Sequence, residues 1–328
     1  KYLGERKGSL IDIVDNTSTA MGGRLLKQRL ISPSCEIKEI ESRLDLADFF
    51  IKKKSKNKLL QLLFREITDI ERALARASLQ KSNPMDLLSI AKVLLQSIKI
   101  KYEINLLTTT KNNNISNLLE KIHFDEKILK NIITGIKDNA NYVKENNFIN
   151  DGFNKELDKI KFFKKKSSQH ILNLQDTYIK LTSINSLKIK FNKVLGYHLE
   201  VRNLHTSKIN NLNQFIHRQT TAQASRYTTN DLLTIEKNIT ESDLKISKME
   251  HEILEEMRLK ILENRELILS ISDVISQLDI ALMTAFQSLN KNYTRPKISN
   301  NRVFFIKEGR HPIIESLQNL VSDDFIPQ

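Results

Sequence analysis

The residues best suited to chemistry are concentrated in one polar, basic stretch, FIHRQTTAQASRYTT, at 215–229. It carries two arginines eight positions apart, Arg218 and Arg226, among hydroxyl and amide side chains and without a carboxylate. Eight residues put two side chains on one face of a strand, and within about 80° of each other on a helix. Arginine forks suit phosphate oxygens, and hydroxyls and amides add contacts that carry no base information. The pattern predicts binding to the backbone of duplex DNA; the alternative is an exposed polar loop whose arginines pair with Glu200 or Asp231.

Two long helices and a β-hairpin must position this stretch. LKIKF and YHLEV, with NKVLG between them, alternate apolar and polar residues and predict a hairpin with one packed face. A helix predicted over 154–180 precedes the hairpin, and a longer one over 231–289 follows the polar stretch. Because one helix leaves and the other returns, they must lie side by side. The positions expected to face the partner helix are Ile239, Ile246, Met249 and Ile253.

A small basic unit over 186–240 is therefore expected at the tip of a two-helix stalk. It contains eight lysines and arginines against three carboxylates, a denser positive charge than in the whole chain. Such an excess favours a polyanionic partner. The residues predicted to contact DNA are Lys193, Arg202, Lys208, Arg218, Gln219, Thr220 and Arg226.

The composition predicts a mainly α-helical protein inside the cell. The 328 residues include only 8 glycines and 5 prolines, with no proline between Pro84 and Pro296, and both residue types disfavour helix interiors. The net charge of +13 again favours a polyanion. The single cysteine, Cys35, excludes an internal disulfide and fits a reducing compartment. We find neither a signal sequence nor the run of roughly 20 apolar residues that spans a bilayer, so we expect location in the cytoplasm or nucleoid and no membrane partner.

Three further segments invite chemical or structural interpretation. RVFFIKEGRHPIIE, at 302–315, predicts a strand followed by a proline-stiffened turn. The lysine run at 51–58 is typical of a solvated helix end. His251-Glu252 lacks the second histidine of a zinc-binding helix, since Glu255 stands in its place, and we expect no metal site.

Six motifs in one order resemble those of the MutS family of DNA mismatch-repair proteins. They are TAMGGRLLKQRL, DIERALARASLQKSNPMDL, INDGFNKELD, LKIKFNKVLGYHLEV, RQTTAQASRYTTNDL, and EGRHPIIE with DDFIP. The resemblance covers the whole chain and implies a mainly α fold, in which a long-helix lever and core bundle carries a small inserted β-containing clamp. It places the core and lever at 1–185 and 241–297, the clamp at 186–240, and the start of an ATPase domain at 298–328.

The resemblance also implies partners and cofactors. In the family, two subunits close their clamps around double-stranded DNA, and the levers relay the nucleotide state of the ATPase domain. The implied partners are duplex DNA, a second subunit of the same or a related chain, and downstream repair factors. Phe325, with Ile326, would lie against the adenine ring, because stacking requires a flat apolar face. The phosphate-binding pattern G-x-x-x-x-G-K-[ST] does not occur in the sequence, so we expect no nucleotide hydrolysis and no cofactor here, and ATP with Mg²⁺ in the full-length parent.

Departures from the family pattern leave alternatives open. Gly22-Gly23 stands where the family has glycine followed by serine, which predicts a looser helix. His198 replaces the second residue of a tyrosine pair, and Ala222 and Ser225 replace a lysine and a glutamate. The mismatch-wedging Phe-x-Glu motif belongs to an N-terminal domain absent from this sequence. The alternatives are a MutS-like paralogue acting on recombination intermediates or branched DNA, and a coiled-coil scaffold without DNA.

Overall fold

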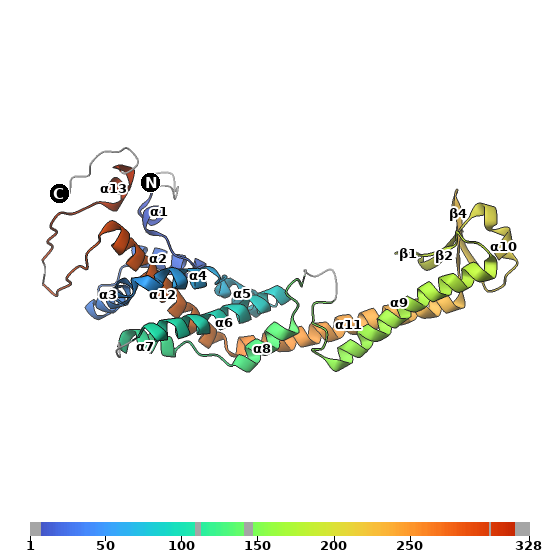
Figure 1. The fold of residues 1–328 in the computed structure, drawn as a ribbon, viewed down its shortest axis with the longest axis horizontal. Helices are drawn as coiled ribbons and strands as arrows, with labels where there is room; N and C mark the ends of the chain where they lie inside the picture. The colour runs from blue at the N-terminus through green and yellow to red at the C-terminus, as the bar shows by residue number, and fades with distance from the viewer. Residues whose placement is uncertain (1–7, 109–112, 141–146, 302, 319–328) are drawn as a thin grey trace. The chain divides into compact units, whose positions relative to one another are not determined.

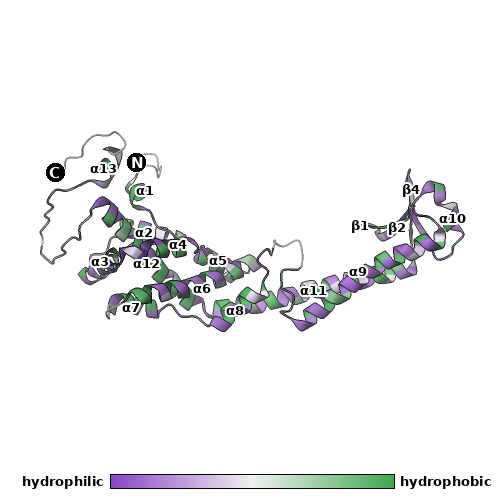
Figure 2. Ribbon diagram, in the orientation of Figure 1, coloured by the Kyte–Doolittle hydropathy of each residue, from purple (hydrophilic) through white to green (hydrophobic). Residues whose placement is uncertain are grey.

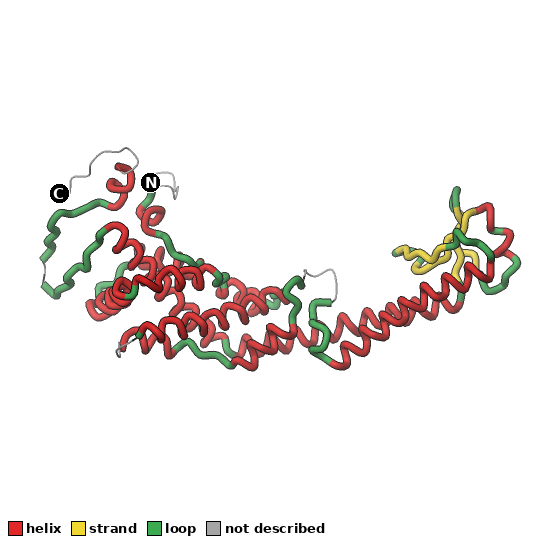
Figure 3. The backbone as a smooth tube through the Cα atoms, in the orientation of Figure 1, coloured by secondary structure: helices red, strands yellow, loops and turns green. Residues whose placement is uncertain are grey.

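The computed structural model describes residues 8–108, 113–140, 147–301 and 303–318, which belong to two compact units (Figure 1). One unit comprises 1–133 and 258–328, and the other comprises 134–257. The elements, in chain order, are α1 (Leu10–Val14), α2 (Ala20–Ile31), α3 (Ile37–Lys52), α4 (Lys54–Arg65), α5 (Ile70–Ser78), α6 (Pro84–Leu107), α7 (Asn113–Glu120), α8 (Glu126–Gly135), α9 (Lys155–Thr182), β1 (Lys188–Asn192), β2 (Gly196–Arg202), a 3₁₀ turn (Asn203–His205), α10 (Ser207–Asn210), β3 (Ile216–Thr220), β4 (Ala224–Thr228), α11 (Asn230–Glu263), α12 (Arg265–Lys291) and α13 (Pro312–Gln318). The fold is mainly α with one small sheet, as predicted (Figure 3).

The first unit is a helical bundle in which α12 is the most buried long helix. Its apolar stripe, which includes Ile268, Ile271, Ile275 and Leu278, is almost fully buried, and α12 packs mainly on α2 and α3. By length and composition α12 could also cross a membrane, contrary to the expectation that no segment of that kind is present. However, 67% of its apolar window is buried inside the protein, as in the core helix of a bundle.

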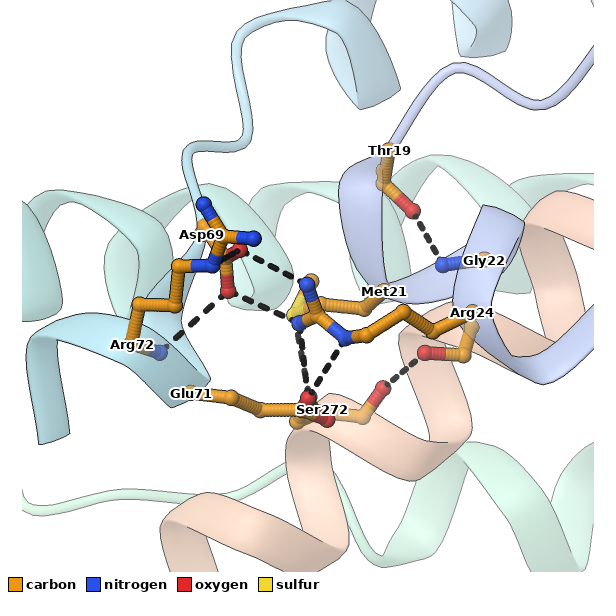
Figure 4. A network of polar contacts seen from close by, with 9 residues as sticks. Thr19, Met21, Gly22, Arg24, Asp69, Glu71, Arg72 and Ser272 are labelled. Atoms are coloured by element: carbon orange, nitrogen blue, oxygen red, sulfur yellow. Dashed lines mark hydrogen bonds and ion pairs between the residues drawn. The ribbon is translucent and has the colours of Figure 1, made fainter. Parts of the chain in front are cut away.

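Two of the sequence motifs meet in an ion-pair network that ties α2 to α5 (Figure 4). Arg24 of the first motif donates through its two Nη atoms to the Asp69 carboxylate at 2.7 and 2.8 Å, and through Nη2 to Glu71 at 2.7 Å. The Arg24 guanidinium holds the pKa of Asp69 below its ordinary value. Glu71 also accepts from Ser272 Oγ of α12 at 2.8 Å. The TAMGGRL and DIER motifs therefore join three helices of one bundle.

The double glycine of α2 marks its closest approach to α12. The Asp279 carboxylate of α12 is buried and accepts from Ser18 N at 3.0 Å, Thr19 N at 2.8 Å and Thr19 Oγ1 at 2.8 Å. Thr19 in turn caps α2 by accepting from Gly22 N at 3.0 Å. A Cβ on Gly22 would lie 2.4 Å from Asp279 Oδ2. Helix α2 runs unbroken through both glycines, and Gly22 lets its N-terminus rest on a buried carboxylate.

The second unit is built on an antiparallel stalk, formed by α9 and α11 up to Met257 (Figure 1). Lys164 Nζ pairs with Asp243 Oδ1 at 2.6 Å. Further along the two helices, Tyr178 OH and Thr229 Oγ1 share a hydrogen bond of 2.7 Å. Figure 2 shows polar and apolar residues mixed along both helices, as the amphipathic pattern requires. The predicted pairing is confirmed: Ile239 and Ile246 are 7% and 5% exposed, and Met249 and Ile253 are half-buried.

One end of the stalk is fixed by a buried carboxylate, Glu250, whose side chain is 0% exposed. Its Oε2 accepts from Asn147 N at 2.6 Å, and its Oε1 accepts from Ile149 N at 3.4 Å and pairs with Lys161 Nζ at 3.0 Å. Lys161 also donates to the Ile149 carbonyl at 2.9 Å. A buried charge is tolerated only with such a set of partners. The INDG motif, with Gly152 at φ +87°, therefore forms a turn whose flanking backbone is held by both stalk helices.

Two element predictions require correction. The helix predicted over 231–289 is two helices, because the chain turns at Asn264, which has φ −101° and ψ 18°. The strand predicted at the start of 302–315 is not formed within the described residues. Val303, Phe304, Phe305 and Ile306 have no strand to pair with and are 62–90% exposed. A β-strand needs a neighbour to satisfy its backbone groups, so an apolar run alone does not fix one.

Candidate nucleic-acid interface

A four-stranded antiparallel sheet lies at the other end of the stalk, with strand order β1-β2-β4-β3. Leu199 and Tyr227 stand opposite each other on the face that packs into a core with Tyr178 of α9 and Leu232 of α11. Since side chains alternate along a strand, the residues between these belong to the opposite face. We call that opposite face the outer face. The register assigns to it Lys188, Lys190, Glu200, Arg202, Gln219 and Arg226.

The polar stretch at 215–229 forms the β3–β4 hairpin. The chain reverses at Thr221, whose N donates to the Ala224 carbonyl at 2.8 Å. Arg218 and Arg226 therefore do not share one strand, as the spacing suggested, but lie on neighbouring strands. Gln219 stands opposite Arg226, and Arg218 is the extra residue of a bulge between His217 and Gln219.

The outer face carries a charge network centred on Glu200. Lys190 Nζ contacts Glu200 Oε1 at 2.6 Å, and Arg226 Nε lies 3.6 Å from Glu200 Oε2. Arg226 Nη1 also donates to Gln219 Oε1 at 2.9 Å. The hydrogen bond from Lys190, with Arg226 and His198 nearby, lowers the pKa of Glu200. The pairing with Glu200 considered above as the alternative therefore applies to Arg226. Arg218 is exposed and makes no ion pair within the described residues.

The other predicted contact residues lie in three different places on or beside the sheet. Arg202 is exposed at the end of β2, opposite Ala224, and so joins the outer face. Thr220 is exposed and shares a hydrogen bond of 2.8 Å with His217. Lys193, in the β1–β2 turn, and Lys208, on α10, are exposed but belong to connections between the strands. The structure therefore brings together Arg202, Gln219 and Arg226 on the outer face. Thr220 stands opposite the buried Ser225 and so belongs to the other side of the sheet, and Lys193 and Lys208 lie off the face.

Two lysines of the outer face were missing from the predicted contacts. Lys188 and Lys190 are exposed on β1, and their register partners Glu200 and His198 show that they share the face of Arg202. The sequence contained the necessary signal, because LKIKF alternates lysine with apolar residues. Extending that alternation across the hairpin would have identified both.

The β1–β2 hairpin, which carries the departure from the family pattern at His198, is held by three contacts. Gly196, at φ +69°, begins β2 where a Cβ would lie 1.8 Å from Glu236 Oε1 of α11. Tyr197 places its ring 5.0 Å from that of Phe191. His198 is buried, and its Nδ1 shares a hydrogen bond of 3.0 Å with the Gly196 carbonyl. These contacts hold the β1–β2 hairpin in place.

Two remaining candidate sites concern metal and nucleotide. The described residues contain no group of three or more His, Cys, Asp or Glu side chains that could hold a metal ion. His251 instead sets its ring edge-on to Phe148, with centroids 5.7 Å apart. Phe325 and Ile326, the predicted adenine contacts, lie outside the described residues.

Fold and site together define a class: a mainly α-helical protein with a small sheet, basic on one face, inserted between two stalk helices. Sequence comparison gives the family. The family profile for MutS domain III matches residues 2–285. The chain belongs to the MutS family.

Similar proteins named DNA mismatch repair protein MutS occur in several bacteria. The protein from Bartonella tribocorum is 32% identical over 337 residues, covering 98% of this chain and 36% of that protein. The Wolbachia pipientis protein is 33% identical over 355 residues, covering 99% and 40%. The Caldanaerobacter subterraneus protein is 32% identical over 316 residues, covering 96% and 36%. The chain thus spans little more than a third of the length of these relatives.

Proposed function

We propose that this chain is the lever and clamp portion of a MutS-type mismatch-repair protein. In this proposal its outer face binds the backbone of duplex DNA, and its lever relays the state of the ATPase domain to the clamp. In this proposal residues 1–185 and 241–297 are the core and lever, 186–240 the clamp, and 298–328 the start of an ATPase domain. The observation that carries the proposal is the charge of the outer face. Four of its side chains, Lys188, Lys190, Arg202 and Arg226, are positive, and only Glu200 is negative.

The chemistry of this face suits phosphate better than bases. The outer face has no aromatic residue on which bases could stack, while its lysines and arginines can each contact a phosphate. Arg218, exposed and without an ion-pair partner in the described part of the chain, needs to break no contact to bind. Arg226 must share its charge with Glu200, so its contribution should be smaller. We infer that the clamp holds DNA without reading its sequence.

The full-length protein would supply the rest of the function. We propose that it binds ATP with Mg²⁺ in a domain that follows residue 328, where Phe325 and Ile326 would contact the adenine. It would act as a dimer with a second copy or a related chain, recruit downstream repair factors, and work on DNA inside the cell. The name shared by the relatives, DNA mismatch repair protein MutS, supports mismatch repair over the paralogue alternative.

Fluorescence anisotropy with labelled matched and mismatched duplexes tests the DNA-binding role. Arg218→Ala should weaken binding by up to about eightfold at 0.1 M salt, because it removes one phosphate contact. Lys190→Ala should weaken binding by less, because Lys190, like Arg226, shares its charge with Glu200. The loss should be equal for matched and mismatched DNA. Lys248→Ala is the control, since Lys248 is 78% exposed on α11, pairs with Glu252 alone among the residues that the structure describes, and lies about 27 Å along the helix from its sheet end.

Three outcomes separate the alternatives. Unchanged binding in both sheet variants would refute the outer-face proposal. Absence of any salt-sensitive binding by the wild-type chain would favour the scaffold without DNA. Stronger binding of a branched junction than of any linear duplex would favour the paralogue that acts on recombination intermediates.

A further inference from the structure

The end of α12 is capped by an arginine from much later in the chain. The last carbonyls of a helix have no partner within the helix and must be satisfied from elsewhere. Arg310 Nη2 donates to the Lys291 carbonyl at 2.7 Å and to the Asn292 carbonyl at 3.1 Å. Asn292 ends the helix in the left-handed region, at φ 52°. The helix terminus is therefore held by a side chain 18 residues beyond Asn292.

The same guanidinium also holds the next helix. Arg310 Nη1 pairs with Glu315 Oε1 of α13 at 3.0 Å, and the Arg310 and Glu315 side chains are only 28% and 16% exposed. The guanidinium carbon lies 5.5 Å from the ring centre of Tyr293, the second residue after α12. A planar fork can satisfy carbonyls on one edge and a carboxylate on another, which a lysine ammonium cannot do with the same geometry. One side chain thus connects the end of α12 to α13.

A second arginine, Arg295, holds the intervening chain to α3. Arg295 pairs with three carboxylates of α3, at 2.8 Å from Asp45 and 2.6 Å from Asp48, and also with Glu41. A cleft of about 650 Å³ separates this anchored segment from residues 306–310. The two arginines have different partners: Arg295 fixes the segment to α3, and Arg310 joins the end of α12 to α13.

We propose that Arg310 is a positioning residue that transmits movement between the nucleotide domain and the lever. The proposal rests on the proposed function, in which α13 leads into the ATPase domain and α12 belongs to the lever. A shift of α13 moves Glu315, which is paired with Arg310. The Arg310 guanidinium then makes or breaks its hydrogen bonds to the last carbonyls of α12. Because α12 is joined through Asn264 to α11, which begins directly after β4, the change reaches the helix that carries the sheet.

The test measures coupling in the full-length protein. The quantity is the ratio of the dissociation constants for duplex DNA with and without ATP, since this ratio is the coupling between the two sites. Arg310→Met should bring the ratio at least tenfold closer to one, while affinity without nucleotide stays within twofold of wild type. Arg310→Lys keeps the charge near Glu315 without the fork and should lose part of the coupling. Arg295→Met is the matched control and should keep the wild-type ratio.

The outcomes are distinguishable. If wild type responds to ATP and Arg310→Met responds equally, the assignment of Arg310 is overturned and the proposed function stands. If Arg295→Met loses as much coupling as Arg310→Met, general loosening of the segment explains the effect and the assignment is again overturned. If ATP does not change the dissociation constant of the wild-type protein for DNA, the relay in the proposed function is refuted. The role of Arg310 in that relay is then refuted as well. Should Arg310→Met fail to fold, Arg310→Lys decides, and wild-type coupling in that variant counts against the proposal.

Discussion

Replacing Gly22 by alanine should destabilise the protein, whereas the same replacement at Gly23 should not, although the two are neighbours in one helix. A Cβ on Gly22 would lie 2.4 Å from Asp279 Oδ2 and 3.0 Å from Thr19 Oγ1. A Cβ on Gly23 would meet nothing closer than Thr17 Oγ1, at 3.3 Å. Only the first substitution has to move a buried charged group.

The contacts of Asp279 set the size of the effect. Glycine to alanine inside a helix gains about 0.5–1 kcal/mol of stability. At Gly22 this gain is opposed by displacement of a carboxylate that accepts from Ser18 N, Thr19 N and Thr19 Oγ1. A buried group left without its partner costs about 1–3 kcal/mol. Loss of two of these bonds costs about 2–6 kcal/mol, which leaves a net cost of about 1–5 kcal/mol for Gly22→Ala, against a gain of up to about 1 kcal/mol for Gly23→Ala.

Urea unfolding followed by circular dichroism measures both variants. The unfolding midpoint should fall for Gly22→Ala and stay level or rise for Gly23→Ala. As a control, Gly22→Ala should cost little in an Asp279→Ala background, because the clashing carboxylate has gone and the two effects are not additive. Equal midpoints for the two glycine variants would refute the reasoning.

Three further predictions concern the stalk, a titrating group and nucleotide. Ile246→Asp should lower the melting temperature, since a charge in the stalk core costs more than the roughly 2–5 kcal/mol of an Ile→Ala change; an unchanged value would show that this face is not buried. Burial raises the pKa of Asp279, so the folded state holds the proton of this carboxyl more tightly than the unfolded state does. The free energy of unfolding should therefore fall as the pH rises through that raised pKa. Asp279→Asn should lose this fall, and a melting profile against pH parallel to that of wild type would contradict the assignment. The purified chain should hydrolyse no ATP, because the pattern G-x-x-x-x-G-K-[ST] does not occur in its sequence. Hydrolysis that persists through repeated purification would overturn the domain assignment.

The sequence was most informative where periodicity and packing agree. Helix α9 begins after Asn154, whose side chain accepts from Glu156 N and Leu157 N. An asparagine directly before a helical pattern is a capping signal that can be read from the sequence. The β1–β2 hairpin was predicted because Leu199 and Val201 alternate with polar residues, and the structure buries both. The heptad spacing of Ile239 and Ile246 likewise predicted a packed helix pair.

The elements that escaped prediction lack such a signal. Strand β3 is exposed along its whole length, so IHRQT shows no alternation, and the hairpin became visible only through its pairing with β4. Because β3 was not predicted, the sequence did not show that Arg218 and Arg226 lie on neighbouring strands. The break at Asn264 lies between two helical patterns that continue on either side, and no proline or glycine marks it. Val303–Ile306 has the composition of a strand but no partner among the described residues.

The salt dependence of duplex binding tests the central claim most directly. Each phosphate contact contributes about 0.9 to the slope of log K against log salt concentration. Arg218→Ala should therefore lower the slope by about 0.9, and Arg226→Ala should lower it by less, because Arg226 already shares its charge with Glu200. Lys248→Ala should leave the slope unchanged. An unchanged slope for Arg218→Ala, or a loss of affinity confined to mismatched DNA, would contradict the account of this sheet as a sequence-independent DNA clamp.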